Sequence, residues 1–234
     1  FGWKGNFDVF DALSCFPHQK PPLSIDFLYG RIDESKLKLR APKAYEKARV
    51  TLHLGERVLG INRTEKTVAT ENGKWEYNKL ILATGAEALI PSIKGIKEAT
   101  NLFTIRHLPD SENLKSCLDD FGKKSKNPKV VIIGAGYIGL EAAASLRKMG
   151  AEVTIIERES RVLQRVTAPI LSEYFTTLHE TNGVEIITSK TVASIATKDR
   201  QQFVVCEDGT GYIADIVIVG VGIKINQSLA ADAG

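Results

Sequence analysis

The chain has 234 residues, enough for one large domain or two small ones. Its 43% apolar and 25% charged residues are ordinary for a globular protein with a substantial core. With 31 basic and 28 acidic side chains the net charge is +3, too balanced to indicate a nucleic acid or an anionic membrane as partner. No apolar run approaches the length of a membrane span.

The cysteines and histidines are scattered along the chain. The cysteines stand too far apart for a zinc site or a C-x-x-C redox pair. We therefore expect no bound metal and three reduced thiols in a cytosol-like compartment, that is, a cytoplasmic protein. These residues are Cys15, Cys117 and Cys206, with His18, His53, His107 and His179.

A first series of strands is predicted between Arg49 and Gly85. It opens with an alternating strand, continues through a hairpin-like series with a turn at residues 71–73, and closes with the apolar run Leu80–Gly85. We expect that last run to be a strand ending in glycine.

Residues 86–128 are predicted to connect two domains. They hold a helix that starts after Asp110 and ends near Gly122, and then a basic loop, Gly122–Lys129. Two interpretations of the loop stay open: a docking patch for an acidic electron carrier, or a solvated loop, which is the more common fate of short lysine runs.

From Lys129 to Arg158 the pattern is that of a dinucleotide-binding unit, KVVIIGAGYIGLEAAASLRKMGAEVTIIER. A β-branched strand leads into Gly134, Gly136 and Gly139, spaced G-x-G-x-x-G before a helix. The first glycine allows the tight turn, the second lets the backbone approach a pyrophosphate, and the third lets the helix pack close to the strand. The phosphates would lie on the helix N-terminus, contacting also the intervening residues Ala135, Tyr137 and Ile138. A glycine-rich turn without a ligand is the alternative.

Glu157 ends the second strand of this unit, close to the expected ~20-residue spacing for a ribose-binding acid. A carboxylate there accepts hydrogen bonds from a 2′-hydroxyl and repels a 2′-phosphate, which favours NAD(H). Arg158 weakens this preference, because an arginine can accommodate the phosphate of NADP(H). A solvated strand end is the other interpretation of Glu157.

The strand series of the front half is repeated between Gly183 and Gly222. Each copy has an alternating strand, a turn ending in glycine, and an apolar run that closes in glycine. Such self-similarity indicates two copies of one domain type. In the second copy, the glycine motif begins at Gly134, ahead of Val184. The same number of residues counted back from Val50, which matches Val184 in the first copy, reaches a position at or before Phe1. Residues 1–128 contain no such glycine motif. The front half is therefore expected to be a dinucleotide domain without its phosphate-binding start.

Together these features resemble the pyridine nucleotide–disulfide reductase superfamily, flavoproteins with two dinucleotide-binding domains. LILATGA (Leu80–Ala86) is similar to the strand and Ala-Thr-Gly motif that lies against FAD, and IVIVGVG (Ile216–Gly222) to the closing strand of the NAD domain. PPLSIDFLYG (Pro21–Gly30) is similar to the segment that packs over the flavin in ferredoxin and rubredoxin reductases and in apoptosis-inducing factor. GYIGLE, RVLQRV and LAADAG point to the same branch.

The resemblance implies an α/β fold of two Rossmann-like, three-layer domains: an incomplete FAD domain in residues 1–101 and a nearly complete NAD(P) domain in residues 102–234. It implies FAD and NAD(H) as cofactors, with NADP(H) possible. The expected activity is an oxidoreductase that passes hydride from NAD(P)H to FAD and electrons to a ferredoxin- or rubredoxin-type iron–sulfur carrier. Without the front glycine motif, this sequence is expected to bind FAD poorly or not at all.

Site residues follow from the same resemblance. Glu141 is implied as the catalytic side chain near the flavin; the alternative is a glutamate placed in the first helical turn by the helix dipole. The nicotinamide would lie near Gly220, Val221 and Gly222. The flavin-side contacts would be Pro22, Leu23, Val58, Ala83, Thr84 and Gly85.

Some positions depart from the family pattern. Ile25 stands where the reductases usually have a lysine that pairs with the glutamate matching Glu141, Glu87 where an arginine is common, and Ile225 where proline is usual. The alternatives are an NADH oxidase, peroxidase or coenzyme A disulfide reductase using Cys15, a redox-sensing NAD(P)H-binding protein like apoptosis-inducing factor, and a degenerate remnant without activity.

Overall fold

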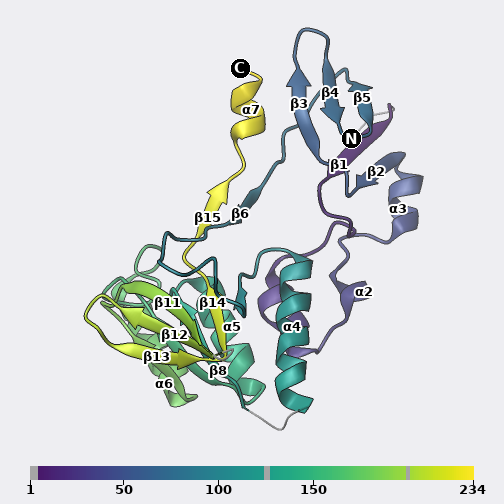
Figure 1. Ribbon diagram of the computed structural model, residues 1–234. Helices are drawn as coiled ribbons and strands as arrows, with labels where there is room; N and C mark the ends of the chain where they lie inside the picture. Colours follow the sequence, from purple (N-terminus) through teal and green to yellow (C-terminus); the bar gives the residue numbers. More distant parts are fainter. Residues whose placement is uncertain (1–4, 124–126, 199–200) are drawn as a thin grey trace. The chain divides into compact units, whose positions relative to one another are not determined.

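The computed structural model describes residues 5–123, 127–198 and 201–234 (Figure 1). They form two compact units, each built from separate stretches of chain. Unit 1 holds the residues up to Gln19, Glu34–Glu87 and Lys224–Gly234, and unit 2 holds Lys20–Asp33 and Ala88–Ile223. The division into domains of residues 1–101 and 102–234 stays a prediction.

Unit 2 is built on a parallel sheet of five strands in the order β10-β9-β8-β14-β7. Val131 of β8 pairs with Thr154 on one side and Val217 on the other. Strands β8 and β14 consist largely of β-branched apolar residues. This composition suits strands that are covered on both faces. The strands are β7 (Leu102–Phe103), β8 (Lys129–Ile133), β9 (Glu152–Ile156), β10 (Val184–Ile187) and β14 (Ile216–Val219).

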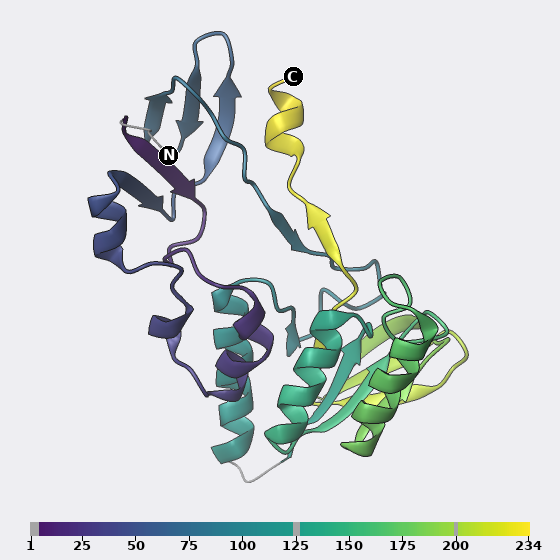
Figure 2. The same cartoon turned by 180° about the vertical axis from the view of Figure 1, so that it is seen from behind.

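Two helices cover one face of this sheet and an antiparallel meander covers the other. Figure 2 shows α5 and α6 in front of the sheet, with the meander behind it. The two helices are α5 (Tyr137–Lys148) and α6 (Pro169–Thr181), and the meander is β11 (Val192–Lys198), β12 (Gln201–Cys206) and β13 (Gly211–Ala214). Unit 2 also contains α4 (Leu108–Lys123). Helix α4 thus begins two residues before the predicted Asp110, whose carboxylate accepts the N–H groups of Arg106 and His107.

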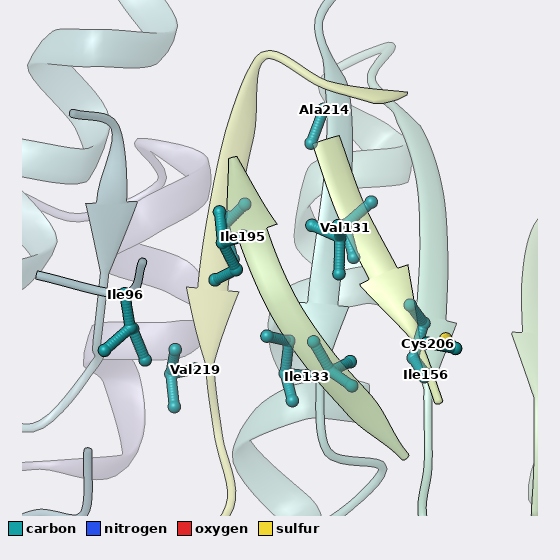
Figure 3. Close-up of a cluster of buried hydrophobic side chains, with 11 residues drawn as sticks. Ile96, Val131, Ile133, Ile156, Ile195, Cys206, Ala214 and Val219 are labelled. Carbon is teal, nitrogen blue, oxygen red and sulfur yellow. The ribbon is translucent and has the colours of Figure 1, made fainter. Parts of the chain in front are cut away.

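The core between sheet and meander is apolar. Val131, Ile133 and Val219 of the sheet face Ile195 and Cys206 of the meander in Figure 3. Each of these side chains is at most 7% exposed. Unit 2 is therefore a three-layer, Rossmann-like α/β domain, as the sequence predicts.

A segment from the front of the chain completes unit 2. The short helices η1 (Pro21–Ser24) and α1 (Asp26–Tyr29) pack on α5 and α4. Leu23 and Leu28 are 1% and 0% exposed there. Sequence patterns alone did not indicate that this segment would belong to the same unit as α5.

Unit 1 contains part of a similar arrangement. A parallel pair, β1 (Phe7–Asp11) and β2 (Val50–Leu54), accompanies an antiparallel meander in the order β3-β4-β5. Its remaining elements are α2 (Glu34–Leu37), α3 (Pro42–Lys47), β3 (Val58–Asn62), β4 (Thr67–Thr70), β5 (Gly73–Glu76) and α7 (Ser228–Asp232). The chain passes between the units at four points, and two of them lie within β6 (Ala86–Ala88) and β15 (Ile223–Ile225). Of the described residues, none lies in a helix that combines the length and apolar character required to cross a membrane.

The predicted repeat is confirmed in part by the two meanders, which have the same antiparallel strand order, whereas the closing strand is present only in the second copy. The copies agree even at the residue before the first strand of each. Gly183 precedes β10 with φ 80°, and Arg49 precedes β2 with φ 56°. Glycine adopts this left-handed conformation freely, whereas a side chain there is strained.

Replacing Arg49 with glycine should therefore stabilise the protein by about 0.5–1 kcal/mol. The substitution relieves the strain of the left-handed backbone, and this gain exceeds the cost of the larger backbone entropy that glycine loses on folding. Urea denaturation would measure this. The matched control is Gly183→Ala. Its Cβ would lie 2.6 Å from Nη2 of Arg147, so this substitution should destabilise the protein instead. Equal stability of Arg49→Gly and the unmodified chain would contradict the strain argument.

The prediction of a strand at Leu80–Gly85 is wrong. No residue of this run is in a strand, and β6 begins only at Ala86. Its counterpart in unit 2, β14, has a paired strand on each side, whereas no described strand pairs with residues 80–85. The apolar side chains stay exposed, Ile81 to 72%. A buried parallel strand needs neighbours to satisfy its backbone groups, and this run has none among the described residues.

Candidate functional site

A cleft of about 230 Å³ lies in unit 2, where β8 and β14 end. Here the strand order reverses, because β9 and β10 lie on one side of β8 and β14 and β7 on the other. Open α/β sheets bind ligands at such a switch point, outside the carboxyl ends of the strands. Eight of the predicted site residues line the cleft: Ala135, Gly136, Tyr137, Ile138, Glu157, Gly220, Val221 and Gly222.

Two of the three motif glycines are required by the packing of the protein itself. A Cβ on Gly134 would lie 2.6 Å from the carbonyl oxygen of Gly220, and its φ of +106° also excludes a side chain. A Cβ on Gly139 would lie 2.1 Å from the carbonyl oxygen of Gly134. These contacts close the turn and bring α5 against β8, as the sequence predicts for these glycines.

Gly136 is different, because no contact among the described residues requires a glycine there. Its φ is −80°, and the nearest atom that a Cβ would meet among the described residues is the carbonyl oxygen of Gly220 at 3.8 Å. Gly136 is the N-cap residue of α5, and no side chain of the described residues caps that helix end. The bare backbone and the uncapped amides face a cleft, which fits a pyrophosphate approaching the helix N-terminus.

Glu157 lies beside this turn, just after β9. Its Oε2 accepts the N–H of Ala135 at 2.6 Å, and its Oε1 accepts the N–H of Glu159 at 2.8 Å. Two backbone donors fix the carboxylate in the cleft wall. Free lone pairs remain for a hydroxyl donor, because each carboxylate oxygen can accept two hydrogen bonds.

A model of the family described as pyridine nucleotide-disulphide oxidoreductase matches residues 4–234. The chain belongs to this family. Membership implies a pyridine nucleotide and a flavin as cofactors.

Similar relatives of this chain include two curated bacterial proteins. It is 38% identical to putidaredoxin reductase CamA of Pseudomonas putida, over 100% of this chain and 55% of the relative. It is 33% identical to a rubredoxin-NAD(+) reductase of Ectopseudomonas oleovorans, over 100% of this chain and 59% of the relative. The chain thus spans little more than half the length of the curated relatives it matches.

The fold agrees with a solved structure of the same kind. The covalent putidaredoxin reductase–putidaredoxin complex gives a TM-score of 0.91 at 36% identity, covering 100% of this chain and 56% of the other. Rossmann-like α/β architecture is therefore established for the chain.

The residues that the resemblance implies at a flavin are divided between the units. Pro22, Leu23 and Glu141 belong to unit 2, and Val58 with residues 83–85 to unit 1. Ala83, Thr84 and Gly85 are exposed. Asn226, which sequence reasoning did not select, holds them: its Nδ2 donates to the Thr84 carbonyl oxygen at 3.0 Å, and its N–H to that of Gly85 at 3.1 Å. Their contact with a flavin stays a prediction.

Glu141 has a partner despite the missing lysine at Ile25. The hydroxyl of Ser24 donates to Oε2 of Glu141 at 2.6 Å. Ser24 is 3% exposed, and its carbonyl oxygen accepts the hydroxyl of Ser145 on α5 at 2.8 Å. Ser24 was missed because a single serine in PPLS carries no chemical signal until the fold brings it to α5.

The cysteines give little support to thiol chemistry. Sγ of Cys15 lies 3.7 Å from Nδ1 of His18, but that nitrogen is closer, at 3.0 Å, to the carbonyl oxygen of Phe16. Burial raises the pKa of the Cys206 thiol, with Lys190 opposing it, so this thiol is poorly reactive. Within the described residues no group of three or more His, Cys, Asp or Glu side chains could hold a metal. Residues 124–126 of the predicted basic loop lie outside the described residues.

Proposed function

We propose that the chain is part of a flavoprotein oxidoreductase in which NADH reduces FAD and electrons pass on to a small ferredoxin- or rubredoxin-type carrier. The observation that carries the proposal is Gly136, a glycine that the protein's own packing does not explain and that exposes bare backbone in a cleft. Relatives named as putidaredoxin and rubredoxin reductases support the choice of acceptor.

In this proposal the turn after β8 binds the nucleotide. The pyrophosphate lies on the backbone of residues 134–139, where the α5 amides donate to it. Glu157 accepts a hydrogen bond from the adenosine ribose, and Arg158 is next to it in sequence. The loop after β14, residues 220–222, supports the nicotinamide end.

Glu141 acts at the flavin-facing side of α5. A bound flavin would supply the chemistry that converts hydride transfer into single-electron transfer. Ser24 restrains the Glu141 carboxylate by a charge-assisted hydrogen bond, a role that the missing lysine would otherwise fill. The flavin contacts are Pro22, Leu23, Val58, Ala83, Thr84 and Gly85.

A thiol-dependent oxidase or disulfide reductase using Cys15 is the weaker candidate. It would need a thiolate at Cys15, and Nδ1 of His18, 3.7 Å from this sulfur, is closer to a backbone carbonyl oxygen. In the FAD-loaded flavoprotein, loss of turnover in Cys15→Ser would favour that function, and unchanged turnover would favour the carrier reductase.

Purified residues 1–234 should bind NADH but no stoichiometric FAD. The phosphate-binding turn of unit 2 is intact, whereas residues 1–128 contain no glycine motif for a second pyrophosphate. Calorimetry with NADH tests the first expectation, NADH binding. Visible spectra recorded after FAD is added and the excess removed test the second, the absence of stoichiometric FAD. A chain that binds neither NADH nor NADPH would refute the proposed function, and tightly bound yellow flavin would refute the second expectation.

A further inference from the structure

Helix α6 lies beside α5 on the sheet of unit 2 (Figure 2), and its two sides are the reverse of those of an ordinary surface helix. Such a helix turns its apolar residues inward and its polar residues to solvent. The two buried side chains of α6, Ser172 and His179, are polar. Four of its exposed side chains are large and apolar. They are Ile170 (74% exposed), Leu171 (47%), Tyr174 (60%) and Leu178 (42%).

Polar contacts of the inner side fix this orientation of α6. The hydroxyl of Ser172 donates to the carbonyl oxygen of Val162 at 2.6 Å and accepts Nη1 of Arg161 at 2.6 Å. Nε2 of His179 lies 3.0 Å from the carbonyl oxygen of Leu140 on α5. Turning the helix to bury its apolar side would break these contacts and leave polar groups in the interior without partners. The apolar side of α6 therefore stays outward.

The outward residues Ile170, Tyr174 and Leu178 follow one another at intervals of four, so they form one continuous line along the helix. With Leu171 beside them they make up the apolar stripe of α6, which exposes on the order of 400 Å². Two such stripes placed against each other would bury roughly 800 Å² in total, the size of a weak, reversible protein–protein interface.

The apolar stripe is complementary to itself. Tyr174 stands midway between Ile170 and Leu178, so a second α6 running antiparallel brings Ile170 of each copy against Leu178 of the other. Tyr174 of the two copies would then meet at the two-fold axis. Interfaces between identical chains are commonly of this kind, with the same surface contributed by both copies.

The charges of α6 favour the same occupant. The helix contains no lysine or arginine and carries two exposed carboxylates, Glu173 and Glu180, which would repel an acidic partner. In the antiparallel pairing Glu180 lies opposite Ala168 of the second copy, the residue at the start of α6. No described side chain caps that helix start, and its partial positive charge stabilises a carboxylate. Glu173 lies opposite Phe175, so the pairing brings no like charges together.

We propose that the apolar stripe of α6 is the contact surface of a symmetric homodimer, in which two copies of this chain pair antiparallel about Tyr174. The inference goes beyond the proposed function and does not depend on it. None of the four stripe residues lines the nucleotide cleft.

Sedimentation equilibrium of residues 1–234 at concentrations of about 1–200 µM tests the proposal. The expected dissociation constant of the dimer is on the order of 10 µM. Tyr174→Glu places two carboxylates at the two-fold axis and should raise this constant about thirtyfold or more. The matched control is Ile213→Glu, which changes a 44% exposed isoleucine on β13 and should leave the dissociation constant unchanged.

A pair of charged variants tests the register. Ile170→Lys and Leu178→Glu should each be monomeric alone, because both contacts of the homodimer are damaged. An equal mixture of the two should form dimers again, since Lys at position 170 of one copy then meets Glu at position 178 of the other. Failure of the mixture to associate would contradict the antiparallel pairing.

Glu180→Gln tests the charge contribution at the helix start. It should weaken the dimer by about two- to fivefold at low salt, and the difference should shrink as salt is added. An unchanged dissociation constant would contradict the placement of Glu180.

A chain that stays monomeric at about 200 µM, or a dimer that is insensitive to Tyr174→Glu, would overturn the inference. A monomeric full-length protein would overturn it as well, because another part of that protein would then cover α6. Circular dichroism shows that each variant is folded, and NADH binding should persist in all of them, so the outcome is independent of the nucleotide site.

Discussion

Gly136→Ala is expected to weaken NADH binding by on the order of a hundredfold while leaving thermal unfolding unchanged. The new Cβ meets no clash, since the nearest atom is 3.8 Å away and φ is −80°. It occupies the space through which a pyrophosphate would approach the first amides of α5. A displacement of about 1 Å at such a site is sufficient for a loss of this size.

Calorimetry of the variant with NADH, and a thermal melt followed by circular dichroism, separate the two effects. If Gly136→Ala bound NADH as the unmodified chain does, the phosphates would not lie on this turn. If it melted several degrees lower, Gly136 would have a structural role that its surroundings do not show.

Gly134→Ala should have the opposite profile, a large loss of stability. Its Cβ would lie 2.6 Å from the Gly220 oxygen and 2.9 Å from its carbon, and φ is +106°. Both atoms are backbone of the chain following β14, which is fixed by the N–H of Gly220 bonded to Ile133. Steric overlap and dihedral strain together should cost about 3 kcal/mol or more.

That cost corresponds to a fall in melting temperature of roughly 6–12 °C for a chain of this size. The unfolding transition of Gly134→Ala can be compared directly with that of Gly136→Ala, because both add one methyl group to the same turn. A Gly134→Ala variant that melts like the unmodified chain would mean that the loop after β14 moves aside freely.

Local patterns predicted the nucleotide unit well. The β-branched run, the three glycines and the acid at the strand end all depend on residues close in sequence, so periodicity and spacing locate them. The two meanders were found because their turns and closing glycines repeat. The sequence also favoured NAD(H) through Glu157, but it left Arg158 ambiguous, since the ion pair with Glu159 depends on side-chain positions that no spacing encodes.

Other features depend on distant parts of the chain, which explains the failures. Leu80–Gly85 has the composition of a buried strand, yet strand formation requires neighbours, and none is described. Ser24 and Asn226 acquire their roles only through partners far along the sequence. The ambiguity at Glu141 had the same origin, because its hydrogen-bond partner is 117 residues away.

That separation also has a consequence for biosynthesis. Residues Lys20–Asp33 leave the ribosome long before α5, on which they pack, and Ser24 meets Ser145 across 121 positions. At about 5–20 residues per second, roughly 6–25 seconds pass between the two. During this interval Leu23 and Leu28 have no α5 to cover them. Unit 2 can therefore complete its fold only when a segment synthesised early packs on a helix that is synthesised much later.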